Sequence, residues 1–146
     1  MAEGKIHRES SEVSMQQLFE DFKKDLGDEV GAVGSFIGVV RGEAKEGGKV
    51  RELQYECMES AEEELKKLAS EIEKEYEGLS EVSVHHIIDN LEPGDEIVYV
   101  FAAGSHREEV FEALPEIMDR LKAEVHIWKK EVTDEDDYWV REERDR

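Results

Sequence analysis

Apolar side chains recur every three or four residues in three stretches of the chain, and this spacing predicts three α-helices. The predicted helices span residues 14–26, 60–78 and 105–122. Each begins with a serine that is followed three residues later by Gln or Glu, the capping-box pattern that satisfies free backbone N–H groups at a helix start. The three serines are Ser14, Ser60 and Ser105.

Shorter stretches rich in Val, Ile, Phe and Tyr, bounded by Gly or Pro, predict six β-strands. These strands span residues 4–8, 31–42, 50–58, 81–89, 95–104 and 124–132. We expect the second and third strands to pair as a hairpin, and Pro93 and Gly94 to make the turn between the fourth and the fifth. The order of strands and helices predicts a single α+β domain over residues 1–146.

The composition narrows the classes of partner. With 39 acidic and 19 basic residues among 146, the chain has a formal net charge of -20, which argues against nucleic acid or an anionic membrane as a general partner. The one cysteine, Cys57, excludes a disulfide framework or a CxxC metal site within one chain, and we expect it to be a small buried hydrophobe. The sequence shows neither the apolar segment of a secretion signal nor a run of membrane-span length, so we expect a cytoplasmic protein.

Against this acidic background, three lysines lie close together in the segment LKAEVHIWKKEV. If residues 124–132 form a strand, its side chains alternate, and Lys129 shares the apolar face of Val125 and Ile127. A lysine there either reaches out to water at the strand end or sits in a pocket, where its pKa could fall. Lys122 ends the third predicted helix, where a cation also stabilises the helix dipole.

A second group of cations stands at the start of the third predicted helix. With Ser105 as the N-cap, His106 and Arg107 occupy the first turn, where free N–H groups and the positive end of the dipole favour an anion. A bound anion would explain both side chains; otherwise they are ordinary surface groups. Arg41 ends the strand 31–42 beside glycines, and either faces water or meets a group that the glycines allow to approach the backbone.

His85 and His86 are neighbours on a predicted strand and therefore point to opposite faces, which is a poor arrangement for binding one metal ion. We interpret both as structural residues, and we expect no metal site and no cofactor. A metal-dependent hydrolase that uses His85, His86 and His106 is the weakest of the alternatives.

Several motifs together resemble the large, catalytic subunit of molybdopterin synthase: FIGVVRG, PGDEIVYV, SHREEVFEA, IMDRLK and IWKKE. The resemblance covers nearly the whole chain, and the motifs have the spacing of that family. It implies an α/β hammerhead fold with an added antiparallel β subdomain. It also implies a homodimer at the centre of a heterotetramer, with a small ubiquitin-like sulfur-carrier subunit at each end.

The activity that the resemblance implies is a sulfurtransferase step of molybdenum cofactor biosynthesis. Sulfur passes from the C-terminal Gly-Gly thiocarboxylate of the small subunit to cyclic pyranopterin monophosphate, which becomes the dithiolene molybdopterin. Carried over position by position, the catalytic residues are Lys122 and Lys129. The substrate-binding residues are Arg41, His106, Arg107, Lys122, Lys129, Lys130 and Glu131, and the pocket-lining residues are Phe36 and Met118. The cations would persist because phosphate and thiocarboxylate are both anions.

The alternative is a non-catalytic paralogue that binds a ubiquitin-like protein or an anionic nucleotide without turnover. The presence of both Lys122 and Lys129 together with His106 and Arg107 favours the enzyme, because a degenerate binder should have lost at least one of them. The prediction requires that these groups and Arg41 gather at one cleft of the folded assembly.

Overall fold

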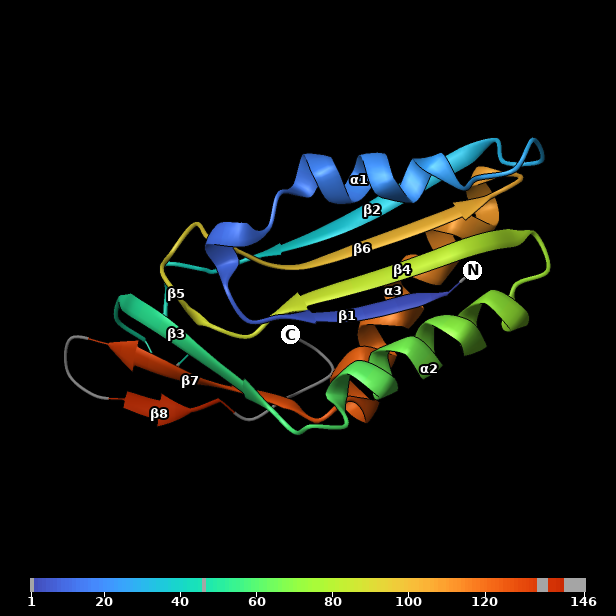
Figure 1. Cartoon of the computed structure of the whole chain (residues 1–146). Coiled ribbons are helices and arrows are strands. Elements are labelled where there is room, and N and C mark those ends of the chain that lie inside the picture. Colours follow the sequence, from blue (N-terminus) through green and yellow to red (C-terminus); the bar gives the residue numbers. More distant parts are fainter. Residues whose placement is uncertain (1, 46, 134–136, 141–146) are drawn as a thin grey trace.

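Two β-sheets and three α-helices make up the part of the chain that the structure, a computed structural model, describes: residues 2–45, 47–133 and 137–140 (Figure 1). In chain order the elements are β1 (Glu3–His7), the 3₁₀ helix η1 (Ser10–Glu12), α1 (Met15–Lys24), β2 (Ala32–Val39), β3 (Val50–Cys57), α2 (Ala61–Glu75), β4 (Leu79–Ile87), β5 (Asn90–Leu91), β6 (Glu96–Gly104), α3 (Arg107–Glu124), β7 (Ile127–Thr133) and β8 (Asp137–Trp139). The three predicted helices and six predicted strands are present, which confirms the α+β class. Residues 134–136 and 141–146 of the polar tail lie outside the described residues. None of the helices described is both long and apolar enough to span a membrane.

The first sheet has the strand order β1-β4-β6-β2, with β1 parallel to β4 and the other pairs antiparallel. Helices α2 and α3 cover one face, and α1 lies across the other (Figure 1). On the α1 face, the rings of Phe19 and Phe22 pack on Phe101, with centroids 5.8 Å and 5.5 Å away. On the opposite face, Gly34 lets α3 approach β2 closely, because a Cβ at this position would lie 2.5 Å from Cγ1 of Val110.

The second sheet, with the order β5-β3-β7-β8, is antiparallel throughout and lies beside one end of the first (Figure 1). The predicted hairpin between residues 31–42 and 50–58 is therefore wrong. Strand β2 pairs with β6 in the first sheet, whereas β3 pairs with β5 and β7 in the second. The local pattern of apolar residues identifies both strands but carries no information on their partners. The residues after β2 take the chain from one sheet to the other.

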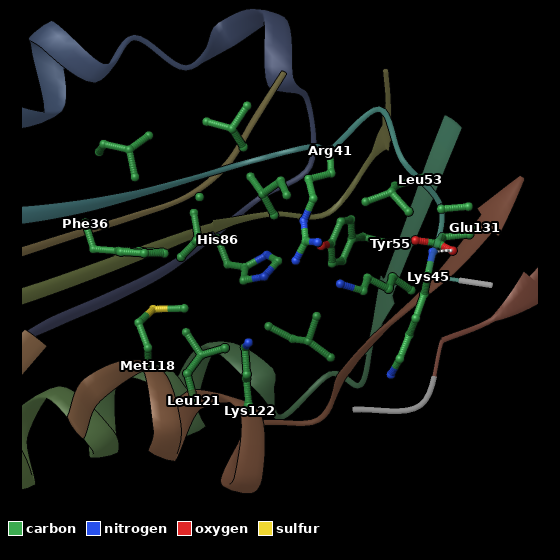
Figure 2. Close-up of a pocket in the computed structure, with 18 of the residues that line it drawn as sticks. Phe36, Arg41, Lys45, Leu53, Tyr55, His86, Met118, Leu121, Lys122 and Glu131 are labelled. Atoms are coloured by element: carbon green, nitrogen blue, oxygen red, sulfur yellow. Dashed lines mark hydrogen bonds between the residues drawn. The ribbon is translucent and has the colours of Figure 1, made fainter. Parts of the chain in front are cut away.

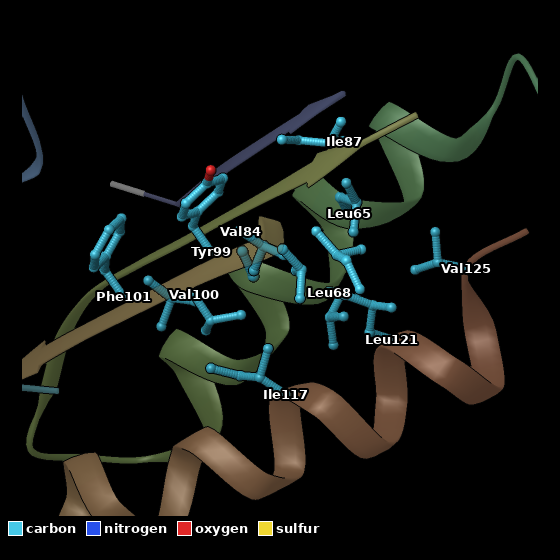
Figure 3. Packing of buried hydrophobic residues seen from close by; sticks show 14 of the residues in the cluster. Leu65, Leu68, Val84, Ile87, Tyr99, Val100, Phe101, Ile117, Leu121 and Val125 are labelled. Carbon is cyan, nitrogen blue, oxygen red and sulfur yellow. The ribbon is translucent and has the colours of Figure 1, made fainter. Parts of the chain in front are cut away.

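Buried side chains from both sheets and from α2 and α3 form one hydrophobic cluster. Figure 3 shows the part of it between the first sheet and the two helices. Leu65 and Leu68 of α2 and Ile117 of α3 lie with Val84 and Val100 of the first sheet, and each of the five is at most 1% exposed. Burying a side chain of this size contributes about 1.5–3 kcal/mol. This packing fixes the position of the C-terminal half of α3, which carries candidate site residues.

The helix starts follow the capping prediction in part. Ser14 caps α1 as predicted, because its Oγ accepts a hydrogen bond from the backbone N–H of Gln17 at 3.3 Å. The other two predicted capping boxes do not form, although Ser60 is the N-cap residue of α2 as predicted. The Ser60 hydroxyl donates to a glutamate one turn further along α2 instead of accepting from the backbone. Helix α3 begins at Arg107, so His106 rather than Ser105 is the N-cap residue, and it makes no side-chain cap hydrogen bond.

Candidate functional site

A cavity of about 570 Å³ opens where the two sheets meet. Its walls come from β2, β4 and β6 of the first sheet, β3 and β7 of the second, the C-terminal part of α3 and the connection that follows β2. A concave site of this volume suits a small-molecule ligand. Of the predicted site residues, the following line it: Phe36, Arg41, Met118, Lys122, Lys129 and Glu131.

Cationic side chains reach this cavity from three separate segments. Arg41 and Lys45 lie in the connection after β2, Lys122 lies near the end of α3, and Lys129 lies on β7. In Figure 2 the guanidinium of Arg41 and the amine of Lys122 point toward each other across the cavity. These four cations outnumber the two glutamates of the lining, Glu43 and Glu131, so the cavity carries an excess of positive charge in a chain of net charge -20, which favours an anionic ligand. No role for Lys45 was predicted from the sequence.

Strand alternation on β7 decides which lysine faces the cavity. Lys129 lines it, which is the pocket alternative for this residue, and so does Glu131 two residues later. Tyr55, the cross-strand partner of Lys129 on β3, lines the same wall. Lys130 is not among the lining residues; its ammonium lies 5.4 Å from the centre of the Trp139 ring, within range of a cation–π interaction. The two neighbouring lysines therefore occupy different environments.

Glu131 attaches the connection after β2 to the second sheet. Its side chain is buried, and Oε1 accepts a hydrogen bond from the backbone N–H of Lys45 at 3.0 Å (Figure 2). A hydrogen bond to a buried carboxylate is stronger than one between neutral groups. Glu131 thus holds in place the segment that carries Arg41 and Lys45.

Apolar side chains line the side of the cavity opposite Arg41 and Tyr55. Figure 2 shows Phe36 of β2 and Met118 of α3 on this side. Phe36 is 40% exposed, so its ring is available to a ligand. An aromatic ring and a thioether favour a flat, polarizable ligand, so the cavity has one side lined by such groups and another that carries cations.

His86 of β4, which we predicted to be a structural residue, also lines the cavity. Its Nδ1 lies 2.9 Å from the carbonyl oxygen of Ile87, and its ring meets that of Tyr55 edge-on, with the centroids 5.2 Å apart. Burial, and then the charge of Lys129, lower the pKa of His86 to about 4. The ring is therefore uncharged at neutral pH. Its signal in the sequence is alternation, which places His86 on the face of the buried residues Val82 and Val84.

His106 and Arg107 lie far from this cavity in the single chain. Both are exposed at the N-terminal end of α3, whereas Lys122 is near the other end. At 1.5 Å per residue, the 15 positions from Arg107 to Lys122 span about 22 Å along the helix. Arg107 Nε lies 3.9 Å from a carboxylate oxygen of Glu108. One chain therefore does not bring all the predicted cations together.

The described residues hold no group of three or more His, Cys, Asp or Glu side chains placed to bind a metal ion. His85 and His86 point to different environments, as their adjacent positions predict. The Nδ1 of His85 is 2.9 Å from Nε2 of His7, and its Nε2 is 2.8 Å from the hydroxyl of Ser83. His106 lies at the start of α3. His85, His86 and His106 therefore do not form, among the described residues, the metal site that the hydrolase alternative requires.

Comparison with known proteins gives the same family by sequence and by structure. The family model described as MoaE protein matches residues 8–124. The molybdopterin synthase catalytic subunit of Pyrococcus abyssi is 33% identical over 141 residues, which is 92% of this chain and 94% of that protein. The probable molybdopterin synthase of Haloferax volcanii is 34% identical over 133 residues, 89% of this chain, but the match spans only 51% of that longer protein.

A solved structure agrees with these matches over nearly the full length of both chains. Molybdopterin synthase from Staphylococcus aureus superimposes with a TM-score of 0.83 and 30% sequence identity, covering 97% of this chain and 98% of the other. The fold, the sequence matches and the family model therefore indicate the same family. The chain belongs to the MoaE protein family, whose members similar to it include molybdopterin synthase catalytic subunits.

Proposed function

We propose that this chain is the catalytic subunit of a molybdopterin synthase and that the cavity between its two sheets is the active site. The substrate is cyclic pyranopterin monophosphate, and the sulfur donor is the C-terminal thiocarboxylate of a small ubiquitin-like subunit, as the sequence resemblance implies. The observation that carries the proposal is the convergence of Arg41, Lys122 and Lys129 on one cavity of a strongly acidic chain. The proposal places this reaction in the cytoplasm.

The two sides of the cavity suit the two parts of the substrate. Arg41, with the fixed geometry of its guanidinium, binds the phosphate, and Lys45 adds a second positive charge from the same connection. Phe36 and Met118 contact the pterin ring. This division orients the substrate, because the phosphate and the ring cannot exchange places without losing both sets of contacts.

The two lysines carry the chemistry in this proposal. The thiocarboxylate sulfur forms a bond to a side-chain carbon of the pterin while a C–O bond at that carbon breaks, and the displaced oxygen leaves as part of the opened phosphate ester or as water. Water then attacks the acyl carbon, and Lys122 stabilises the negative charge that develops on the acyl oxygen. The acyl C–S bond breaks, the sulfur stays on the pterin and the small subunit leaves as a carboxylate. Lys129 transfers the protons that these steps require. A second thiocarboxylated subunit supplies the second sulfur of the dithiolene.

The roles predicted for His106 and Arg107 require a second copy of the chain, because Arg107 lies about 22 Å along α3 from Lys122 of its own chain and His106 directly precedes Arg107. The homodimer expected from the resemblance provides one. Apolar residues that are exposed on the edge strand β2 and on α3 support a contact surface between two copies of the chain. They are Val33, Phe36, Val39 and Phe111. Phe36 and Val39 also line the cavity, so a copy that covers this surface would lie at the cavity itself.

Two finer features of the architecture belong to the same proposal. The separate antiparallel sheet of β3, β5, β7 and β8 supports an α/β hammerhead with an added antiparallel subdomain. The hydrophobic cluster that joins both sheets supports one domain over residues 1–146.

The direct test mixes the purified chain with a thiocarboxylated small subunit and cyclic pyranopterin monophosphate and measures dithiolene product. We expect Lys122→Ala to slow turnover on the order of a hundredfold, as for the loss of a group that stabilises an oxyanion, while the complex with the small subunit still assembles. Lys74→Ala, which removes an exposed lysine from the last turn of α2, is the matched control. Complex formation without product in the wild type would favour the non-catalytic binder.

A mixing experiment tests the second copy. If Arg107 acts in the cavity of its partner, a heterodimer of Lys122→Ala and Arg107→Ala chains contains one cavity with both defects and one with neither. We therefore expect two weakly active preparations to recover activity when they are unfolded and refolded together. If Arg107 acts in its own chain, both cavities stay defective and no recovery occurs.

A further inference from the structure

His86 is a buried polar residue that lines the cavity and has no role in the reaction steps proposed above. It lies on β4 directly after the buried Val84 and His85, and it is 4% exposed. In Figure 2 its imidazole lies in the middle of the lining residues, with Phe36 and Met118 on one side and Arg41 on the other. A side chain in this place is within reach of a ligand that contacts both sides.

The hydrogen bond to the backbone fixes the tautomer of this ring. The carbonyl oxygen of Ile87, 2.9 Å from Nδ1, can only accept, so Nδ1 carries the proton and Nε2 carries a lone pair. The edge-on contact with Tyr55, at an interplanar angle of 65°, restrains the plane of the ring. Within the described residues, Nε2 makes no hydrogen bond to protein, which leaves this acceptor for a ligand.

The charge state makes His86 different from its neighbours in the cavity. Because burial and the charge of Lys129 hold the pKa of the ring near 4, it is neutral at physiological pH. Arg41, Lys122 and Lys129 are donors only, and they suit the anionic part of a substrate. A neutral acceptor beside them suits an N–H donor, and a pterin ring carries such groups.

We propose that His86 contacts the substrate and accepts, at Nε2, a hydrogen bond from an N–H group of the pterin ring. This inference rests on the proposed function, since it assumes that a pterin occupies the cavity. It assigns to His86 the recognition of the heterocycle, while Arg41 and the lysines recognise the phosphate and the thiocarboxylate. A phosphate ester without a ring donor would not use His86.

Two amide variants separate this role from a purely structural one. In His86→Gln the side-chain amide reaches the position of Nε2, so an acceptor is kept. In His86→Asn the amide reaches only the position of Nδ1, so the bond to the Ile87 carbonyl is kept and the acceptor is lost. The measurement is the dissociation constant of cyclic pyranopterin monophosphate, by calorimetry on the full chain without the small subunit. Inorganic sulfate, which has no proton to donate, is titrated as a competitor.

We expect His86→Asn to weaken pterin binding by about tenfold, the usual cost of a lost hydrogen bond. We expect His86→Gln to stay within about threefold of the wild type, and sulfate to bind all three proteins equally. Wild-type affinity in His86→Asn with loss in His86→Gln would show that only the backbone bond matters and would overturn the proposal. Equal pterin affinity in both variants and the wild type would overturn it as well.

A measurement on the wild type guards against variants that fail to fold. The ¹⁵N resonance of an unprotonated Nε2 moves upfield when that nitrogen accepts a hydrogen bond, so we expect such a shift on addition of the pterin and none with sulfate. An unchanged resonance with bound pterin overturns the role of His86 but leaves the proposed function intact. If the wild type neither binds the pterin nor forms dithiolene with the small subunit, the proposed function fails, and the role of His86 fails with it.

Discussion

The depressed pKa of His86 makes a quantitative prediction about acid stability. The ring titrates at about 4 in the folded chain, against an ordinary value of 6.5. Above pH 6.5 it is neutral in both states and has no effect on the pH dependence of stability. Between pH 6.5 and 4 the unfolded chain binds a proton that the folded chain does not, so stability falls as the pH falls. At 1.36 kcal/mol per pKa unit, the loss is about 2 kcal/mol by pH 5 and about 3 kcal/mol below pH 4.

The assay compares the wild type with His86→Gln, because glutamine does not titrate. Urea unfolding of both proteins at several pH values between 7.5 and 5.0 gives two free energies of unfolding at each pH. Effects of the other histidines and of the many carboxylates are common to both proteins and cancel in the difference. We expect the wild type to lose about 2 kcal/mol relative to His86→Gln between pH 7.5 and 5.0. A difference that stays constant with pH would refute a neutral, buried His86.

Three further predictions concern the core, the contact between α2 and α3, and the anion site. Leu65→Ala, at a fully buried position of α2, should lower the free energy of unfolding by about 2–5 kcal/mol in urea titrations; a loss below 1 kcal/mol would contradict the packing. Arg120 of α3 donates hydrogen bonds to the carboxylates of Glu71 and Glu75 of α2, so Arg120→Ala should lower the free energy of unfolding by roughly 1–2 kcal/mol. The loss should be smaller at high salt because these carboxylates are partly exposed. A loss that does not change with salt would refute an ionic contact. Arg41→Ala should raise the KM for the pterin about tenfold to a hundredfold, as for a lost charged hydrogen bond; an unchanged KM in steady-state kinetics would remove Arg41 from the phosphate site.

The sequence predicted the elements of this fold better than their pairing. Each helix and strand has its own apolar period, and the Pro93–Gly94 turn brings β4 and β6 together as expected. The hairpin prediction failed because β2 and β3 follow one another in the chain but belong to different sheets. Pairing of β3 with β7 joins strands that are far apart in the sequence, and such long-range pairing leaves no local mark.

The same limit explains which site residues could be found. Alternation alone placed Lys129 on an inward face, and the structure shows it at the cavity. The same argument applies to His86, which follows two buried valines on one face of β4, but a histidine on an apolar face is usually a satisfied core residue. Lys45 was missed because it lies in a glycine-rich connection, where neither the helical nor the strand spacing of apolar residues applies. One tertiary contact that holds this residue in place is the hydrogen bond between its backbone N–H and Glu131.

The cavity depends on both sheets at once, and this ties its binding properties to the packing of the whole chain. Lys122 is placed by the packing of α3 on the first sheet, whereas Lys129 is placed by the ladder between β3 and β7 in the second. Arg41 leaves the first sheet and is carried toward the second on the connection that Glu131 holds. Mutual repulsion of these cations opposes their approach, and Glu43 and Glu131 at the same cavity, together with packing and hydrogen bonds, offset it. An anionic ligand that relieves this repulsion would stabilise the contact between the sheets in proportion to its affinity.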